Sequence, residues 1–407
     1  MELLSPAGNI EKLSYAYRYG ADAAYIGVKS FSLRARADNF HSDEHEEIRR
    51  IKGEKKLYCA INIYFHNQDL RRLEEELDYL ARYPFDAFIV SDPGIIGLLR
   101  RRFPDRPLHL STQANCVNSE SVKFYRDAGF SRIILGREVS LTEIDAMRRE
   151  VPDVELEAFV HGAMCLAYSG RCFLSAWMVG RTANQGDCSH SCRWKYRLVT
   201  DGLAIEEEKR PGEYYPVVEG DGFTTILSSR DICMIDHLRQ LRDAGIDSVK
   251  IEGRMKSIYY AAVVTRAYRK QLDHILGRGV TADEAARYVS DLYRVSHREY
   301  STGFFFGRGE ADRTTERSYQ QNHRFLGIIG ARRETDTFNL LMKNQILTGA
   351  PLEVIGPDIP HLTVSDYRIF DSDGNRVDKA DHGKSYTIQT TAPVEEGFLI
   401  RSTVEEP

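Results

Sequence analysis

The sequence lacks any apolar run close to the ~20 residues that a membrane-spanning helix requires. Its start, MELLSPAGN, has neither the basic region nor the long apolar core of a secretory signal peptide. These absences predict a cytoplasmic protein with no membrane contact. The seven cysteines are then expected to be reduced thiols, which in such a compartment serve metal binding or catalysis more often than disulfides.

Several nucleotide-binding and hydrolase motifs are also missing. The sequence has no Gly-x-Gly-x-x-Gly or Walker motif and no Gly-x-Ser-x-Gly elbow. These absences argue against dinucleotide-dependent enzymes, P-loop NTPases and α/β-hydrolases. The formal net charge of −5 gives no global sign of a nucleic-acid-binding protein. A local basic face stays open, because binding depends on how charge is distributed.

The first 160 residues alternate short apolar runs with amphipathic helical patterns, which predicts a parallel sheet built from βα units. Helical patterns end at Gly20 and Gly129, and Ser140 to Glu143 forms a capping box that starts another helix. The expected strands are Glu2–Ser5, Ala23–Gly27, Leu57–Ile63, Ala87–Ser91, Leu108–Thr112, Arg132–Leu135 and Leu156–Val160.

An eighth strand is expected at Ser248–Ile251, after a cysteine-rich stretch at about 162–222. If that stretch is an insertion after strand seven, residues 1–280 form a (β/α)8 TIM-like barrel. An open doubly wound sheet is the alternative, which the strand count disfavours. Between the insertion and the eighth strand we expect a short strand at Thr225–Ser228 and a helix at Ile232–Ala244.

Residues 323–407 show only short β patterns separated by turns, which predicts a small C-terminal antiparallel β-barrel. Residues 281–322 are expected to be a linker with one helix, Ala282–Tyr293, and an extended aromatic segment, Tyr300–Phe306, that packs between the domains. The expected C-terminal strands are Phe325–Ala331, Thr337–Met342, Pro351–Ile355, Thr363–Phe370, Ser385–Thr390 and Phe398–Ser402.

Four of the seven cysteines lie within 28 residues, spaced Cys-x6-Cys-x15-Cys-x3-Cys: Cys165, Cys172, Cys188 and Cys192. Four thiols among Gly, Ser, Asp and His suit a metal site, either zinc or an iron–sulfur cluster. The spacing matches neither a zinc ribbon nor a ferredoxin, so it leaves the metal open. We interpret Cys59 and Cys116 as small buried apolar residues, and Cys233 as a reserve ligand.

Polar side chains gather where the expected strands end, which is where a barrel places its active site. Period-two alternation puts Glu157 and His161 on one face of strand seven, which we expect to face the lumen. Strand eight does the same with Lys250, Glu252 and Arg254. Other strand ends carry Asn62, Gln113 and Arg137.

A nucleophilic thiol is a second interpretation of this region, because His161 lies four residues before Cys165. A thiol protease needs one activated thiolate, a base and an oxyanion hole, and it does not need four clustered cysteines. Metal binding is therefore favoured.

The stretch from Glu157 to Ser175, with His161-Gly, Cys165, Ser169-Gly-x-Cys172 and Ser175, resembles the signature of peptidase family U32. The phrases ELLSPAGN, GADAAYIG, STQANC and SVKIEGRMKS are similar to further stretches of that family. The resemblance covers essentially the whole chain. It implies the barrel and the small C-terminal β-barrel, and the QGDCSHSCRWKY ending is most similar to the branch that hydroxylates tRNA.

The resemblance implies an iron–sulfur-dependent, oxygen-independent tRNA hydroxylase that forms 5-hydroxyuridine at the wobble position, with prephenate as hydroxyl source. A [4Fe–4S] cluster would then be held by Cys165, Cys172, Cys188 and Cys192, with Cys233 in reserve for Cys192. A paralogous family partner is also implied. The alternatives are a collagenase-like peptidase, as the family name says, and a non-catalytic RNA-binding protein with structural zinc.

In that setting the site residues take expected roles. The expected catalytic residues are Glu157, His161, Glu252 and Arg254, and a small dicarboxylate co-substrate would meet Arg137, Lys250, Gln113 and Asn62. Arg side chains suit carboxylates because the planar guanidinium makes bidentate bonds. Further candidate cations are Arg34 and Arg36 for the co-substrate and, for tRNA phosphates, Arg49-Arg50, Arg71-Arg72, Arg100–Arg102 and Arg148-Arg149.

Overall fold

A computed structural model describes residues 1–28, 31–32, 44–165, 167–169, 171–172, 174–181, 183, 187–193, 204–206, 214–216, 218–220, 223–225, 229–307 and 319–403. The chain divides into two compact units. The first comprises Met1–Tyr17, Ala21–Ala261 and His297–Gln320, and the second comprises Arg18–Gly20, Ala262–Ser296 and Gln321–Pro407.

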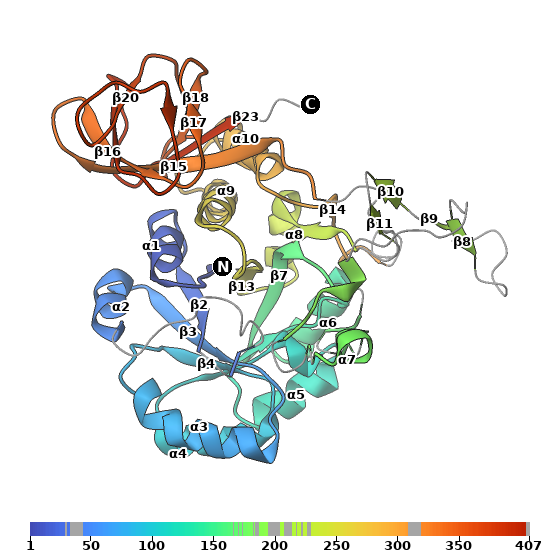
Figure 1. Cartoon of the computed structure of the whole chain (residues 1–407). Helices are drawn as coiled ribbons and strands as arrows, with labels where there is room; N and C mark the ends of the chain where they lie inside the picture. The colour runs from blue at the N-terminus through green and yellow to red at the C-terminus, as the bar shows by residue number, and fades with distance from the viewer. Residues whose placement is uncertain are drawn as a thin grey trace. The chain divides into compact units, whose positions relative to one another are not determined.

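Eight parallel strands close the barrel of the first unit, as predicted (Figure 1). The last of them, β13, pairs with both β7 and β1, so the sheet closes on itself. In chain order the strands are β1 (Glu2–Pro6), β2 (Ala23–Gly27), β3 (Lys56–Ile61), β4 (Ala87–Val90), β5 (Leu108–Leu110), β6 (Arg132–Ile134), β7 (Glu155–Ala163) and β13 (Ser248–Ile251).

Helices follow the strands, and Figure 1 shows α3 to α6 outside the barrel. The predicted capping box is present, because the Ser140 hydroxyl accepts from Glu143 N and the Glu143 carboxylate accepts from Ser140 N. The α-helices are α1 (Ile10–Arg18), α2 (His45–Lys52), α3 (Asn67–Leu80), α4 (Ile96–Arg102), α5 (Ser119–Asp127), α6 (Leu141–Glu150), α8 (Leu238–Asp243) and α9 (Ile258–Ile275). Short 3-10 turns are η1 (Pro93–Ile95), η2 (Thr112–Ala114) and η5 (Ile235–His237).

Alternate strand residues fill the barrel interior with apolar and aromatic side chains, as the period of two requires. One buried cluster comprises Leu4, Ala23, Tyr25, Tyr58, Ala60, Ala87, Ile89, Ile134 and Phe159, drawn from strands β1 to β4, β6 and β7. The aromatic members supply flat surfaces against which the charged residues of the lumen lie.

The long connection from β7 to β13 contains α7 (Leu174–Val179), η4 (Ser191–Arg193) and two antiparallel strand pairs, β8 (Ala204–Glu206) with β9 (Tyr214–Pro216) and β10 (Val218–Gly220) with β11 (Phe223–Thr225). It then forms β12 (Asp231–Cys233), which pairs antiparallel with the end of β7 and parallel with β14 (Tyr300–Ser301). The predicted helix Ile232–Ala244 is therefore wrong at its start. Its apolar residues extend the sheet, and the helix begins only at Leu238.

The aromatic segment after β14 belongs to the barrel unit. Phe305 O accepts from Leu141 N, and the Phe306 ring lies 4.8 Å from the His237 ring. These contacts lie within one unit, so the expectation that the segment packs between the domains is not supported by them.

The second unit contains a curled antiparallel sheet in the order β19-β18-β23-β15-β16-β22-β20. The predicted strand Thr363–Phe370 is two strands, and the predicted helix Ala282–Tyr293 is α10 (Ala282–Val289) followed by η6 (Ser290–Arg294). Buried Asp291 of η6 binds Arg401 of β23 at 2.6 Å, which joins the helical part to the sheet. The strands are β15 (His323–Arg332), β16 (Thr337–Met342), β17 (Ile346–Leu347), β18 (Leu352–Ile355), β19 (Leu362–Val364), β20 (Arg368–Phe370), β21 (Lys379–Ala380), β22 (Tyr386–Gln389) and β23 (Leu399–Thr403).

None of the helices in the described ranges is long and apolar enough to cross a membrane.

Candidate active site

Arg137 lies just past β6, at the carboxyl end of the barrel, and its guanidinium faces an aromatic ring. The guanidinium carbon lies 4.0 Å from the centroid of Phe159, and Nη2 lies 3.8 Å from Oε2 of Glu252, just past β13. Within the part of the chain that the structure describes, the buried Nε has no hydrogen-bond partner. Buried donors are normally satisfied, so this arginine has capacity for an anionic ligand.

Arg254 and Lys250 share Tyr25 as a neighbour. The Arg254 guanidinium carbon lies 5.7 Å and the Lys250 ammonium 4.3 Å from the Tyr25 ring centroid. Arg254 Nη1 donates to Ser32 Oγ at 2.5 Å. Gly27 makes room for this guanidinium, because a Cβ there would lie 2.2 Å from Arg254 Nη1. The strand-eight cations are therefore held against the end of β2.

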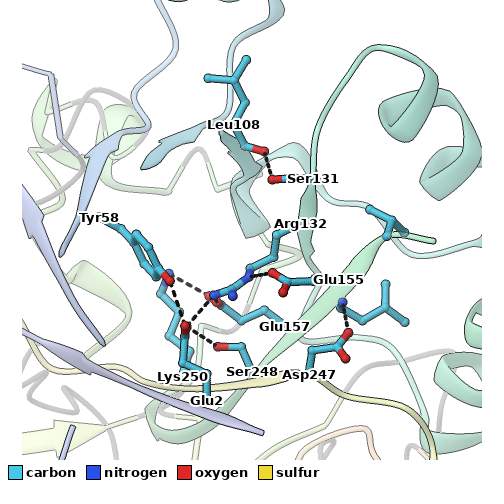
Figure 2. Close-up of polar contacts among 12 residues, drawn as sticks. Glu2, Tyr58, Leu108, Ser131, Arg132, Glu155, Glu157, Asp247, Ser248 and Lys250 are labelled. Carbon is cyan, nitrogen blue, oxygen red and sulfur yellow. Dashed lines mark hydrogen bonds and ion pairs between the residues drawn. The ribbon is translucent and has the colours of Figure 1, made fainter. Parts of the chain in front are cut away.

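Glu157 is fully buried and belongs to an ion network inside the barrel (Figure 2). Its carboxylate lies 3.0 Å from Arg132 Nη1 and 3.1 Å from the Lys250 ammonium. Arg132 also binds Glu2 at 2.6 Å, and the Tyr58 hydroxyl donates to Glu2 at 2.8 Å. Burial raises the pKa of Glu2, but Arg132, Tyr58 and Lys56 together lower it by more, so the net pKa is below the ordinary value. The carboxylate of Glu157 is thus engaged by two cations.

His109 is a lumen residue that the sequence did not single out. Its ring centroid lies 4.8 Å from that of Tyr58, and burial, followed by the charge of Arg132, holds its pKa well below the ordinary value. A single histidine in a three-residue strand gives no pattern from which to select it.

His161 has different neighbours from Glu157. The register between β7 and β13 shifts by one residue, so Phe159 pairs with Lys250 whereas His161 pairs with Ile251. Such a bulge breaks the alternation of side chains. The His161 ring lies 5.3 Å from Tyr300 and 6.0 Å from Tyr260. The described contacts of His161 thus differ from those of Glu157, and a shared catalytic role for the two residues stays a prediction.

Burial lowers the pKa of His161 to about 3, so its imidazole is neutral at physiological pH. It can accept or donate one hydrogen bond at each ring nitrogen according to its tautomer, without carrying charge.

Asp231 and Arg298 form a buried ion pair that the sequence analysis missed. Arg298 also donates to Ser229 Oγ at 3.2 Å and to Met164 O at 3.3 Å, and Ser229 Oγ donates to Met164 O at 2.7 Å. Met164 directly follows β7 and Ser229 lies just before β12, so they mark the two ends of the cysteine-rich connection between these strands. The Arg298 guanidinium therefore binds both ends of the connection. The pair with Asp231 could not be predicted from local sequence, because the two residues are 67 positions apart.

The loop carrying Cys165 and Cys172 is attached to the end of β6. Ser169 N donates to Glu138 Oε1 at 2.6 Å, and Arg137 N donates to Ser169 Oγ at 3.2 Å. Because Ser169 is buried, the loop is fixed beside Arg137. Ser169, between Cys165 and Cys172, therefore lies next to the barrel mouth.

The four clustered cysteines are free thiols; Cys165 is exposed and the other three are half-buried. Ser189 N donates to Ser175 Oγ at 2.9 Å, which holds the start of α7 near the segment with Cys188 and Cys192. The donor chemistry fits a thiolate-bound metal. Among the described residues, however, no three His, Cys, Asp or Glu side chains converge as a metal site.

The remaining cysteines differ from these four. Cys59 and Cys116 are buried, and burial raises the pKa of Cys116 to about 12. Their interpretation as small core residues is confirmed. Cys233 is half-buried on β12 directly opposite His161 on β7.

The other predicted substrate-binding residues also lie at strand ends. Asn62 follows β3, where its carbonyl accepts from Ser91 Oγ at 3.2 Å, and Gln113 lies in η2 after β5, where its carbonyl accepts from the Tyr64 hydroxyl at 2.7 Å. Arg34 and Arg36 lie outside the described residues.

The candidate phosphate-binding arginines lie on the barrel's helices α2, α3, α4 and α6. Arg148 is occupied locally, since it binds Gly245 O and Asp247. The basic residues of α2, α4 and α6 lie in the last turn of each helix, and Arg71 and Arg72 of α3 are exposed to solvent.

Comparison with known proteins gives a family for the whole chain. The model of peptidase family U32 matches residues 8–315, and that of the peptidase family U32 C-terminal domain matches residues 321–401. The tRNA hydroxylation protein P of Escherichia coli (strain K12) is 38% identical over 396 residues, covering 88% of this chain and 86% of that protein. The tRNA hydroxylation protein P1 of Bacillus subtilis (strain 168) is 38% identical over 391 residues, covering 94% of this chain and 89% of that protein.

Among solved structures, the U32 peptidase Mk0906 is 16% identical with a TM-score of 0.39, covering 62% of this chain and 93% of that chain. Since the family models span nearly all of the sequence and both relatives exceed the identity at which membership is secure, this chain belongs to peptidase family U32.

Proposed function

We propose that this protein is a tRNA-modifying hydroxylase that forms 5-hydroxyuridine at the wobble position. Two relatives that align over most of their length are named tRNA hydroxylation proteins. The observation that carries the proposal is Arg137, whose buried Nε is unsatisfied, at the barrel mouth beside the loop of Cys165 and Cys172. The arginine can bind the carboxylate of a small acid, and the neighbouring thiols can hold a redox cofactor. The two together suit a reaction in which a bound acid reacts beside an electron-transfer group. The protein would act in the cytoplasm.

A small dicarboxylate is the co-substrate in this proposal, with prephenate as the hydroxyl source. The upper lumen holds three cations, Arg137, Lys250 and Arg254, against the carboxylates of Glu157 and Glu252. The charge of Glu157 is shared between Arg132 and Lys250. Positive charge beside the flat rings of Phe159 and Tyr25 favours an unsaturated acid. Glu252 and Arg254 follow β13 at the mouth, on the same side as Arg137, while Asn62 and Gln113 supply neutral donors.

The cofactor in this proposal is a [4Fe–4S] cluster on Cys165, Cys172, Cys188 and Cys192, with Cys233 as the reserve ligand. When bound, such a cluster supplies one-electron transfer. Zinc is the alternative, and it would give a structural site. Iron and sulfide analysis after anaerobic purification separates them: about four iron and four sulfide per chain supports the cluster, and about one zinc without iron contradicts it.

The reaction is tested with tRNA from a strain that lacks the gene. Nucleosides from that strain should lose 5-hydroxyuridine and its derivatives, and a plasmid copy of the gene should restore them. An Arg137→Met copy should fail to restore them at equal protein level. A paralogue of the same family is the expected partner, so its gene is removed as well. If the nucleosides are unchanged when both genes are removed, the proposal is contradicted.

Peptidase activity is a second candidate, because Cys233 lies opposite His161 across β12 and β7. A thiol beside a neutral imidazole is the minimum for nucleophilic catalysis. Gelatin cleavage that is lost in both Cys233→Ser and His161→Gln supports this candidate. Cleavage that survives both substitutions identifies a contaminant.

A further inference from the structure

Lys256 lies between two tyrosine rings on the carboxyl side of the barrel. Its ammonium is 4.4 Å from the centroid of Tyr319 and 5.2 Å from that of Tyr260. Its backbone N donates to Gly253 O at 2.8 Å, in the turn that follows β13. Gly253 permits the close approach of Tyr260, because a Cβ there would lie 2.6 Å from that ring. A cation at these distances holds each ring by attraction to its π-electrons.

The inner side of this cluster leads to the barrel mouth. Tyr260 is buried, and its hydroxyl donates to Glu252 O at 3.2 Å. Glu252 in turn lies 3.8 Å from Arg137. The Tyr260 ring also faces His161 at 6.0 Å. The cluster is therefore continuous with the candidate active site.

The outer side of the cluster meets solvent. Tyr319 is 43% exposed and Met255, next to Lys256, is 49% exposed. Single exposed apolar side chains are common on protein surfaces. Here an aromatic ring, a thioether and an ammonium group occur together at the rim of the proposed site, and this combination is typical of a ligand-binding surface.

An unstacked nucleotide matches these three groups. A base stacks on an aromatic ring whatever its identity, and an ammonium neutralises the adjoining phosphate. A target base must leave its stack to enter a pocket, so its neighbour has to be held outside. A protein partner would bury roughly 800 Å² on each side, whereas three side chains have the size of one nucleotide.

We propose that Tyr319, Met255 and Lys256 form a docking platform for the RNA nucleotide that adjoins the target uridine. The inference rests on the proposed function for the identity of the RNA, and it adds the surface that holds the RNA. Tyr319 supplies the stacking face, Met255 extends it, and Lys256 both orients the ring and binds the phosphate.

The test measures binding of a fluorescein-labelled anticodon stem-loop with an unmodified wobble uridine, by anisotropy at several NaCl concentrations. Tyr319→Ala should weaken binding by about 5- to 150-fold without changing the salt dependence, since one base loses its stacking partner. Tyr319→Phe should bind like the unaltered protein. Lys256→Met should weaken binding and reduce the slope of log affinity against log salt by about 0.7–0.9, the value for one phosphate contact.

Phe124→Ala is the matched control, because Phe124 is an exposed aromatic residue on the outer helix α5. Equal affinities for Tyr319→Ala and Phe124→Ala overturn the platform, and so does an unaltered protein that does not bind the stem-loop. Lys256→Arg should restore the salt slope, which separates charge loss from misfolding. Formation of 5-hydroxyuridine is measured in parallel: binding without hydroxylation contradicts the proposed function and leaves the platform standing.

Discussion

Asp231 and Arg298 form a buried ion pair with 2.7 Å between Oδ1 and Nη2, although they lie 67 positions apart in the chain. Arg298 donates to both carboxylate oxygens, through its side chain to Oδ1 and through its backbone N to Oδ2. Burial raises the pKa of Asp231, but Arg298 and Lys256 together lower it by more, so the carboxylate is ionised at neutral pH. Because the same guanidinium bonds Met164 O and Ser229 Oγ, this pair fixes both ends of the cysteine-rich connection.

Replacing Arg298 with Met should destabilise the barrel unit by about 3–5 kcal/mol, because Asp231 is left charged and buried without a partner. Urea denaturation measures the loss. Tryptophan fluorescence suits the experiment, because both tryptophans, Trp177 and Trp194, lie in the cysteine-rich connection.

The double variant Asp231→Asn, Arg298→Met is the control for this prediction. It removes both charges, so it should recover part of the lost stability. A single Arg298→Met variant as stable as the unaltered protein would show that the pair does not hold the connection.

Stability should fall as the pH drops from about 6.5 toward 3, in part because of His161. Its folded pKa of about 3 lies below the ordinary 6.5, so within this window the unfolded chain binds a proton that the folded chain does not. A single such group lowers the free energy of unfolding by about 1.4 kcal/mol per pH unit. Urea denaturation at pH 7.5, 6.0 and 5.0 measures the slope.

A His161→Gln variant should show a smaller slope over the same pH range. His237→Gln is the comparison, because the His237 ring is only half-buried beside Phe306. If His161→Gln and the unaltered protein lose stability in parallel, His161 titrates in the folded state and the prediction is wrong.

Adding one methyl group at Gly27 should displace Arg254. A Cβ there would lie 2.2 Å from Arg254 Nη1 and 2.5 Å from Ser32 Oγ, so the guanidinium cannot keep its position. We expect Gly27→Ala to lower kcat/KM for tRNA hydroxylation by at least about tenfold, which is ~1.4 kcal/mol of transition-state stabilisation. The assay is single-turnover formation of 5-hydroxyuridine.

Gly97→Ala is the matched substitution for that experiment. Gly97 lies in α4, where a Cβ would approach only the flexible end of Arg101 at 3.4 Å. Alanine in a helix is favoured over glycine by about 0.5–1 kcal/mol, so this variant should be at least as stable and fully active. If the two alanine variants are equally active, the position of Arg254 does not matter for the reaction.

Arg137→Lys should impair use of the acidic co-substrate while leaving the fold intact. Lysine keeps the charge but loses the planar fork that binds a carboxylate through two parallel bonds. We expect KM for the co-substrate to rise by about 10- to 100-fold with little change in the melting temperature. If KM stays within twofold of the value for the unaltered protein, Arg137 does not bind the carboxylate of the co-substrate.

The barrel was predictable because each strand is a short apolar run followed by an amphipathic helix, and because Ser248–Ile251 supplied the eighth strand. The segment Ile232–Ala244 was not predictable in the same way. Its apolar residues fit a helical period, but Ile232 and Cys233 pair with β7, a contact with residues some 70 positions earlier in the chain. Local pattern does not contain such long-range pairing.

The candidate site was predictable where it depends on strand ends. Arg137, Lys250, Glu252 and Arg254 all lie around Phe159 and Tyr25 because parallel strands end at one rim. The relationship of Glu157 to His161 was not predictable, because a single-residue bulge in β7 leaves no mark on the alternating pattern. Arg298 was missed because its partner lies far away in the chain.

The length of β7 has a consequence for solubility. This strand has nine residues, whereas β5 and β6 have three each, so its end continues past the closed barrel. A protruding strand offers unpaired backbone groups to which another chain can add, the usual beginning of edge-to-edge aggregation. Here β12 covers that edge, and β14, only two residues long, covers β12. The last edge is thus too short to serve as a template for a neighbouring molecule.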